Sequence, residues 1–192
     1  MHKSAKRYFD WAYEYQIAAL MLHTQIAAAP YLYNPIIFLL RHTIELLLKG
    51  LIIGEVKQKS NTRIDEIKVG KQNRKLNQTH SLLELWDKYT FVASDVIRTD
   101  DFILVDKVIK MLNRKDPYSD RYRYPQSKQK HNFATEPVQL DCSGKSPDIA
   151  DGIPYVLITD GVPAVINKGP ILLQDLSDII EVTEILFDCS EK

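Results

Sequence analysis

Apolar residues recur at helical spacing in five segments of the chain, so the pattern predicts a mainly α-helical protein. Capping residues and helix breakers bound most of these segments. Ser81 followed by Glu84 has the spacing of a capping box, and Thr99 precedes two aspartates that favour a helix N-terminus. We therefore expect helices at residues 4–29, 36–53, 79–94, 99–112 and 171–188.

The segment 36–53 is apolar on almost every face of the expected helix. Asn34 is a good N-cap, Pro35 suits the first helical position, and Gly54 marks the expected end. The segment has 18 residues, which is nearly long enough to span a membrane. Its charged residues decide between a membrane span and a buried helix.

Arg41, Glu45 and Lys49 are four residues apart, which places them on one face of the helix with alternating charge. A charge at the centre of a lone membrane span costs about 3 kcal/mol. A helix that is apolar all round except for one charged stripe is typical of the core of a soluble bundle. The sequence therefore predicts a buried helix and not a membrane span.

The segments between the predicted helices are long. Residues 55–78 are polar and basic and predict a long loop that can contain a short hairpin. Residues 116–170 begin as a polar, aromatic loop and end with two apolar runs that flank Thr159-Asp160-Gly161, a hairpin signal. We expect residues 1–192 to form a single up-and-down bundle of four to five helices, with a small β-hairpin insertion before the closing helix at 171–188.

Charge is unevenly distributed along the chain, although 25 basic and 25 acidic residues give a formal net charge of zero. Residues 55–79 carry seven basic and three acidic residues, and residues 107–131 carry eight and two. Residues 132–192 carry three basic and eleven acidic residues. This pattern fits either solvated loops with one acidic surface helix, or a basic groove for nucleic acid or nucleotide.

Two further observations limit the class of function and the location. Cys142 and Cys189 are not part of a CxxC pair, and no His lies at ligand spacing from either, so we expect no metal site. No Gly-rich phosphate loop is present, and we expect no cofactor. The first residues lack the apolar region of a secretory signal, and the cysteine usage fits a reducing compartment, so we expect a cytoplasmic protein.

Three segments together resemble the HEPN superfamily, which is named for a nucleotide-binding domain of prokaryotes and higher eukaryotes. Residues 41–49 (RHTIELLLK) look like the second helix of the family, where a Glu and a Lys interrupt an apolar helix. Residues 79–85 (THSLLEL) are similar to the pattern that opens the next helix, and residues 116–125 resemble a loop of uncharacterised members. The resemblance implies a HEPN-like bundle of four to five helices, usually a homodimer.

Many members of this superfamily are metal-independent ribonucleases of bacterial toxin–antitoxin, abortive-infection and CRISPR-linked systems. Their signature is an Arg, four to six residues and then a His, and the two side chains meet across a dimer interface. Only Arg74 and His80 fit that spacing here, and they precede the position that the family uses. Arg123 and His131 lie nearer to that position but are separated by seven residues.

The candidate catalytic residues follow from the chemistry of RNA cleavage through the 2′-hydroxyl. One group must take the hydroxyl proton, and a cation must stabilise the charged phosphorane. His80, His131 and Arg123 are the candidates for these roles. Alternatively, His80 tethers a loop at a helix N-terminus and His131 is only solvated.

The candidate RNA- or ligand-binding residues are basic, aromatic and acidic side chains of the same regions. The stripe on segment 36–53 either faces a cleft or forms an ion ladder along one helix. The loop tyrosines and arginines either stack on bases and hold phosphate or pin the loop to the bundle. The candidates are Arg41, Glu45, Lys49, Arg74, Arg121, Tyr122 and Tyr124.

From these observations we expect a HEPN-like, RNA- or nucleotide-associated component of a bacterial stress or phage-defence system, with or without catalysis of its own. One alternative is an active metal-independent ribonuclease toxin. Another is a structural dimerisation and interaction module whose acidic last helix docks a basic partner protein. In each case we expect a homodimer and no membrane association.

Overall fold

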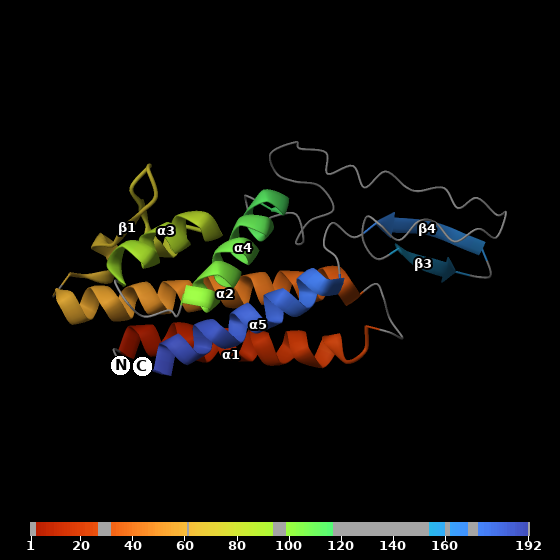
Figure 1. Ribbon diagram of the computed structural model, residues 1–192, viewed down its shortest axis with the longest axis horizontal. Coiled ribbons are helices and arrows are strands. Elements are labelled where there is room, and N and C mark those ends of the chain that lie inside the picture. Colours follow the sequence, from red (N-terminus) through yellow and green to blue (C-terminus); the bar gives the residue numbers. More distant parts are fainter. Residues whose placement is uncertain are drawn as a thin grey trace.

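A computed structural model describes residues 3–26, 32–60, 62–93, 99–116, 154–159, 162–168 and 173–191. The described part is mainly α-helical, as the sequence predicts, with two antiparallel hairpins (Figure 1). The helices are α1 (Lys3–His23), α2 (Tyr33–Lys59), α3 (Leu82–Val92), α4 (Thr99–Lys115) and α5 (Leu173–Glu191). The strands are β1 (Lys68–Val69), β2 (Arg74–Lys75), β3 (Pro154–Thr159) and β4 (Val162–Lys168), and two short 3-10 helices are η2 (Ile64–Glu66) and η3 (Leu76–Gln78).

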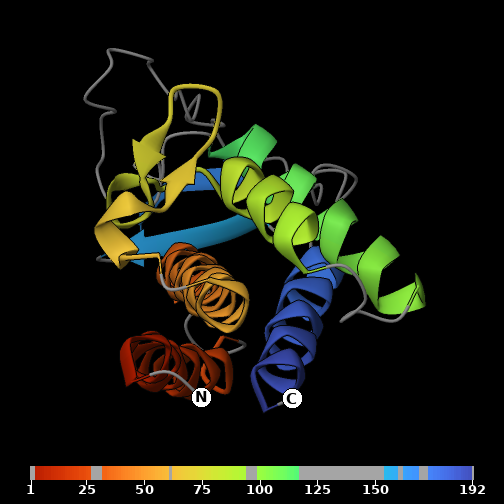
Figure 2. The same cartoon turned by 90° about the vertical axis from the view of Figure 1, so that its left-hand side faces the viewer.

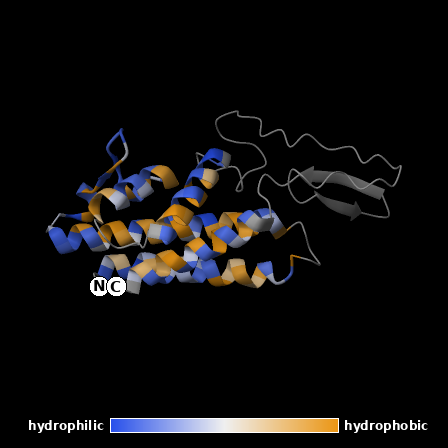
Figure 3. Ribbon diagram, in the orientation of Figure 1, coloured by the Kyte–Doolittle hydropathy of each residue, from blue (hydrophilic) through white to orange (hydrophobic). Residues whose placement is uncertain are grey.

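Helix α2 is the central element of the bundle. It packs against α1, α3 and α5, and α4 packs against α3 and α5 (Figures 1 and 2). Every residue from 43 to 53 is buried, although hydrophilic positions interrupt the hydrophobic ones along α2 (Figure 3). Full burial of one Leu or Ile side chain contributes about 1.5–3 kcal/mol, so α2 supplies much of the driving force for folding. Among the described residues, no helix is long and apolar enough to cross a membrane.

The close approach of α1 to α2 depends on a glycine. The Phe9 ring of α1 lies directly against Gly50, and a Cβ at this position would overlap the ring. A glycine inside a helix costs about 1 kcal/mol relative to alanine. Here the cost is offset because the backbone of α2 offers space that a buried aromatic ring fills.

Helix α2 continues beyond the end that the sequence suggested. The prediction that it stops at Gly54 was wrong, since the helix includes Gly54 and runs to Lys59. Gly54 does not adopt a positive φ, and an ion pair between Lys59 Nζ and Glu55 Oε2, at 3.5 Å, spans the last turn. The polar composition of residues 55–59 therefore reflects a solvated helix end and not a loop.

The segment between α2 and α3 is ordered around a small hairpin, so only part of the predicted long loop is irregular. Strands β1 and β2 pair through Lys68 with Lys75 and Val69 with Arg74. Gly70 and Asn73 adopt positive φ values of 70° and 50° in the turn, a conformation that these residue types tolerate best. The buried side chains that anchor the segment are Ile67, Val69 and Leu76.

The remaining boundaries lie close to the predicted ones. The Ser81 hydroxyl caps α3 by accepting a hydrogen bond from the Glu84 amide at 3.3 Å, as the capping-box spacing indicates. The predicted hairpin before the last helix is present as β3 and β4, with Thr159 paired to Val162. Helices α4 and α5 differ from their predicted ranges by two or three residues at their ends, where helix limits are least defined. The predicted end of the first helix was wrong, since α1 ends at His23 and residues 24–26 form a turn, whereas residues 27–29 lie outside the described residues.

Substitution of the two glycines of α2 tests this packing. We expect Gly50→Ala to lower the free energy of unfolding by about 1–3 kcal/mol, because the new methyl group forces Phe9 out of place. Gly54 has open space around its Cα, so Gly54→Ala should raise the free energy by about 0.5–1 kcal/mol. Urea unfolding followed by circular dichroism measures both values, and equal stabilisation by both variants would contradict the packing.

Candidate functional site

The charged stripe of α2 is buried in the core. The side chains of Arg41 and Glu45 are each 1% exposed and that of Lys49 is 5% exposed. Lys49 Nζ donates a hydrogen bond to Glu45 Oε1 at 2.8 Å, and Arg41 Nη1 lies 3.6 Å from Glu45 Oε2. Two cations of the same helix therefore flank the Glu45 carboxylate, one turn to either side.

A third partner of Glu45 comes from the segment that leads into α3. His80 Nδ1 lies 2.9 Å from Glu45 Oε1. The His80 side chain is 49% exposed, whereas the Glu45 side chain is 1% exposed. His80 immediately precedes Ser81, the N-cap residue of α3. The cap therefore fixes the backbone next to His80. The imidazole thus joins a buried carboxylate to the protein surface.

Arg41 connects the same site to the end of α4. Its Nη2 donates to the His80 carbonyl at 3.1 Å and to the Asp116 carbonyl at 3.3 Å. Its Nε lies 3.4 Å from Asp116 Oδ2, and both side chains are almost fully buried. We refer to Arg41, Glu45, Lys49, His80 and Asp116 as the Glu45 cluster. It joins three parts of the chain, namely α2, the residue before the α3 cap and the residue that follows α4.

The electrostatics of the cluster follow from its composition. Arg41 and Lys49 balance Glu45 and Asp116, so the four buried side chains carry no net charge when both carboxyl groups are ionised. Burial by itself raises the pKa of the Glu45 carboxyl. The hydrogen bond to His80 and the charge and hydrogen bond of Lys49 outweigh burial and lower this pKa to about 2. Glu45 is therefore a carboxylate at neutral pH.

The negative charge of Glu45 also reaches α1. Burial raises the pKa of the Tyr8 hydroxyl, and the Coulombic interaction with Glu45 raises it further. Tyr8 is only half-buried and lies on α1, which packs against α2. The phenol therefore stays neutral, and remains a hydrogen-bond donor, to a higher pH than an ordinary tyrosine.

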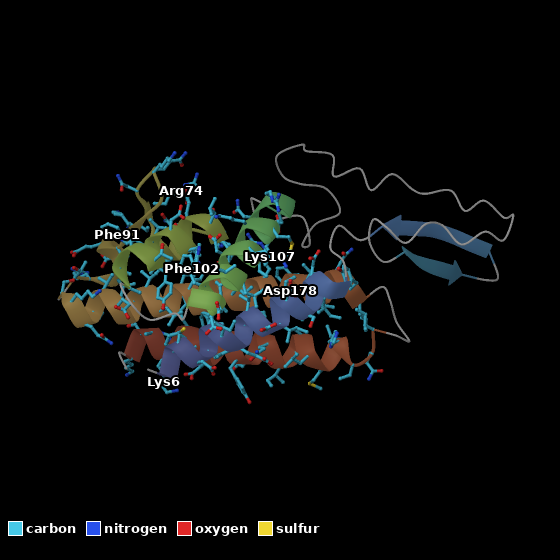
Figure 4. The ribbon with its side chains drawn as sticks, viewed as in Figure 1. Lys6, Arg74, Phe91, Phe102, Lys107 and Asp178 are labelled. Atoms are coloured by element: carbon cyan, nitrogen blue, oxygen red, sulfur yellow. The ribbon has the colours of Figure 1, made fainter. Side chains whose placement is uncertain are left out.

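A basic surface lies a few residues before His80 in the chain. The hairpin of residues 68–75 carries four cations and no acidic residue, and every residue in it except Val69 is exposed. Arg74 lies on β2, where its guanidinium donates to Gln72 Oε1 (Figure 4). We refer to residues 68–75 as the basic hairpin.

The basic hairpin is fixed to the body of the protein on the side of α3. Gly70 lies directly against the Glu84 carboxyl group, so that a Cβ at residue 70 would overlap it. The Thr79 hydroxyl donates to the Lys75 carbonyl at 3.1 Å, which links β2 to the residue before His80. The hairpin and His80 therefore belong to one locally ordered segment.

The structure sorts the predicted site residues into three groups. It brings together His80 and the stripe residues Arg41, Glu45 and Lys49, but burial places the stripe in the core and not on a surface that phosphate could reach. Arg74 is exposed on the basic hairpin. The other candidates lie outside the described residues, namely Arg121, Tyr122, Arg123, Tyr124 and His131.

Sequence reasoning considered Arg123 as an ion-pair partner of Asp116 and missed the pairing of Asp116 with Arg41. A carboxylate at the end of a helix is disfavoured by the helix dipole. Asp116 follows directly after α4, so its position signalled a need for a cation elsewhere in the fold. Arg41 supplies that cation from 75 residues away in the sequence.

A metal site would need several His, Cys, Asp or Glu side chains in one place. The structure shows no group of three or more such side chains within the described ranges. No family model matches this chain, and neither a curated protein nor a solved structure matches it.

The pKa of Glu45 predicts how stability depends on pH. The pKa in the folded state, about 2, is below the ordinary value of 4.5, so the contribution to stability is present above pH 4.5 and is lost as the pH falls towards 2. The difference corresponds to about 3 kcal/mol. We expect Glu45→Gln to flatten the fall in urea midpoint over this pH range, whereas Glu14→Gln, at an exposed position of α1, should follow the wild type. An unchanged pH profile in Glu45→Gln would contradict the assignment.

Proposed function

We propose that this protein binds RNA through the basic hairpin, as a HEPN-like component of a bacterial stress or phage-defence system. The observation that carries the proposal is a hairpin with four exposed cations and no acidic residue among its eight positions. Lysine and arginine contacts to phosphate supply most of the affinity in sequence-independent RNA binding. A rigid hairpin offers these contacts at little cost in conformational entropy.

The resemblance to the HEPN superfamily supports RNA over other polyanions. Two of the three segments that carry it, residues 41–49 and 79–85, contribute Arg41, Glu45, Lys49 and His80 to the Glu45 cluster. A homodimer is part of the proposal on the same ground. The buried stripe does not provide the phosphate contacts in this account, because exposing paired core charges would cost several kcal/mol.

A second candidate function, a metal-independent ribonuclease, is favoured by the contact between His80 and Glu45. In this reaction Nε2 of a neutral His80 takes the proton of an RNA 2′-hydroxyl, and the 2′ oxygen attacks the adjacent phosphorus. The bond from phosphorus to the 5′ oxygen breaks, and this oxygen takes a proton from water. The products are a 2′,3′-cyclic phosphate and a 5′-hydroxyl, and a cation such as Arg74 would stabilise the phosphorane.

The third candidate, an interaction module, is supported by the surface of α5. Glu181, Glu184 and Asp188 are exposed and recur at helical spacing. They form an acidic face that a basic partner protein could contact, although rim charges of this kind contribute more to association rate than to affinity. Helix α5 itself has no lysine or arginine between Leu173 and Glu191.

Salt-dependent binding tests the main proposal. We expect the triple variant Lys68→Gln, Lys71→Gln, Arg74→Gln to bind a short single-stranded RNA more weakly than the wild type. The slope of log Kd against log salt should fall by about 2, since each lost phosphate contact on a single strand contributes about 0.7. Fluorescence anisotropy at several salt concentrations measures this slope.

The matched control is Lys3→Gln, Lys6→Gln, Arg7→Gln, which removes the same number and type of exposed cations from α1. It should keep the wild-type slope. Equal loss of slope in both triple variants would show that affinity reflects overall charge, and the proposed binding surface would be rejected.

A further inference from the structure

We infer that Glu45 is a positioning residue for His80, which it holds in the tautomer that carries the proton on Nδ1 and presents Nε2 as a proton acceptor. The inference rests on the second candidate function, because in that reaction Nε2 of His80 is the proton acceptor. The sequence predicted that Glu45 contacts a ligand, whereas the inference gives it the role of orienting His80. The inference also assigns a task to the two buried cations beside it.

The tautomer follows from hydrogen-bond chemistry. A carboxylate has no proton to donate, so the 2.9 Å contact between Glu45 Oε1 and His80 Nδ1 requires the proton to be on Nδ1. In the neutral ring the other nitrogen, Nε2, then holds a lone pair. Within the described part of the chain, no hydrogen-bond partner of Nε2 is found. The ring is half-exposed, so a substrate can approach it.

The carboxylate is held in place from both sides. Lys49 donates to the same Oε1 atom at 2.8 Å, and Arg41 lies beside Oε2 at 3.6 Å. Glu45 and the two cations beside it, Arg41 and Lys49, are buried. A group fixed in this way cannot follow a moving imidazole, so the imidazole must adopt the orientation that the carboxylate sets.

The main chain of His80 is held by the same cluster. Arg41 Nη2 donates to the His80 carbonyl at 3.1 Å, while Glu45 accepts from the ring. One turn of α2 therefore controls both the backbone and the side chain of His80. In Ser-His-Asp hydrolases, a buried aspartate likewise fixes the tautomer of the histidine base.

The consequence for catalysis is quantitative. A correctly placed general base contributes about 10²–10⁴-fold to the rate of a proton-transfer step. Loss of the Glu45 contact would leave His80 free to rotate and to adopt the other tautomer. The rate constant kcat should then fall within that range while KM for RNA, which the basic hairpin determines, changes little.

The test compares two variants of the full chain by NMR of the imidazole nitrogens at mildly alkaline pH. Lys49→Met removes one of the two cations that hold the carboxylate but keeps both partners of the contact between Glu45 and His80. The double variant Glu45→Met, Lys49→Met removes the contact without leaving Lys49 as an unpaired buried charge. We expect the wild type and Lys49→Met to carry the proton on Nδ1, and the double variant to lose this tautomer.

The same three proteins are assayed for cleavage of a short RNA and of its DNA counterpart. Cleavage of RNA alone, with a kcat that is lower in the double variant than in Lys49→Met, supports the inference. The predicted tautomers without cleavage would remove the ribonuclease candidate and leave the positioning of His80 established. A wild-type ring protonated on Nε2, or a double variant that keeps the wild-type tautomer, would overturn the inference whether or not RNA binds.

Discussion

A carboxylate in the middle of the most apolar helix is the constraint around which the described structure is arranged. An ionised Glu45 would be strongly disfavoured in this position without partners. Helix α2 supplies two cations itself, at Arg41 and Lys49, and His80 supplies a third contact from outside the helix. Arg41 in turn needs an anion, which Asp116 provides. These ion pairs therefore link α2 to the start of α3 and to the end of α4, in addition to the apolar packing between the helices.

Stability alone does not explain why such a cluster occurs in a core. Replacement of buried ion groups by apolar side chains of similar size is often neutral or stabilising. The cluster also holds a half-exposed imidazole at the protein surface, through the contact between Glu45 and His80. The basic hairpin follows the same logic, since Gly70 and Glu84 fix a charged surface to the body of the protein close to His80 in the chain.

Local features of the fold could be predicted from the sequence because local physics determines them. The helical periodicity, the cap at Ser81 and the hairpin around residue 160 all depend on neighbours within a few positions. The end of α2 could not be predicted, because Gly54 terminates a helix only when the chain adopts a positive φ there. The stripe at Arg41, Glu45 and Lys49 was evident, but spacing on one helix does not show whether that face meets solvent or the core.

The contacts that form the candidate site depend on the tertiary fold. His80 reaches Glu45 across 35 residues and Asp116 reaches Arg41 across 75, so no spacing rule in a single sequence reveals either pair. A double-mutant cycle with Arg41→Met and Asp116→Ala, followed by urea unfolding, tests most directly whether this cluster joins α2 to the end of α4. The account predicts a coupling energy of about 1–3 kcal/mol between the two side chains. Destabilisations that simply add in the double variant would contradict it.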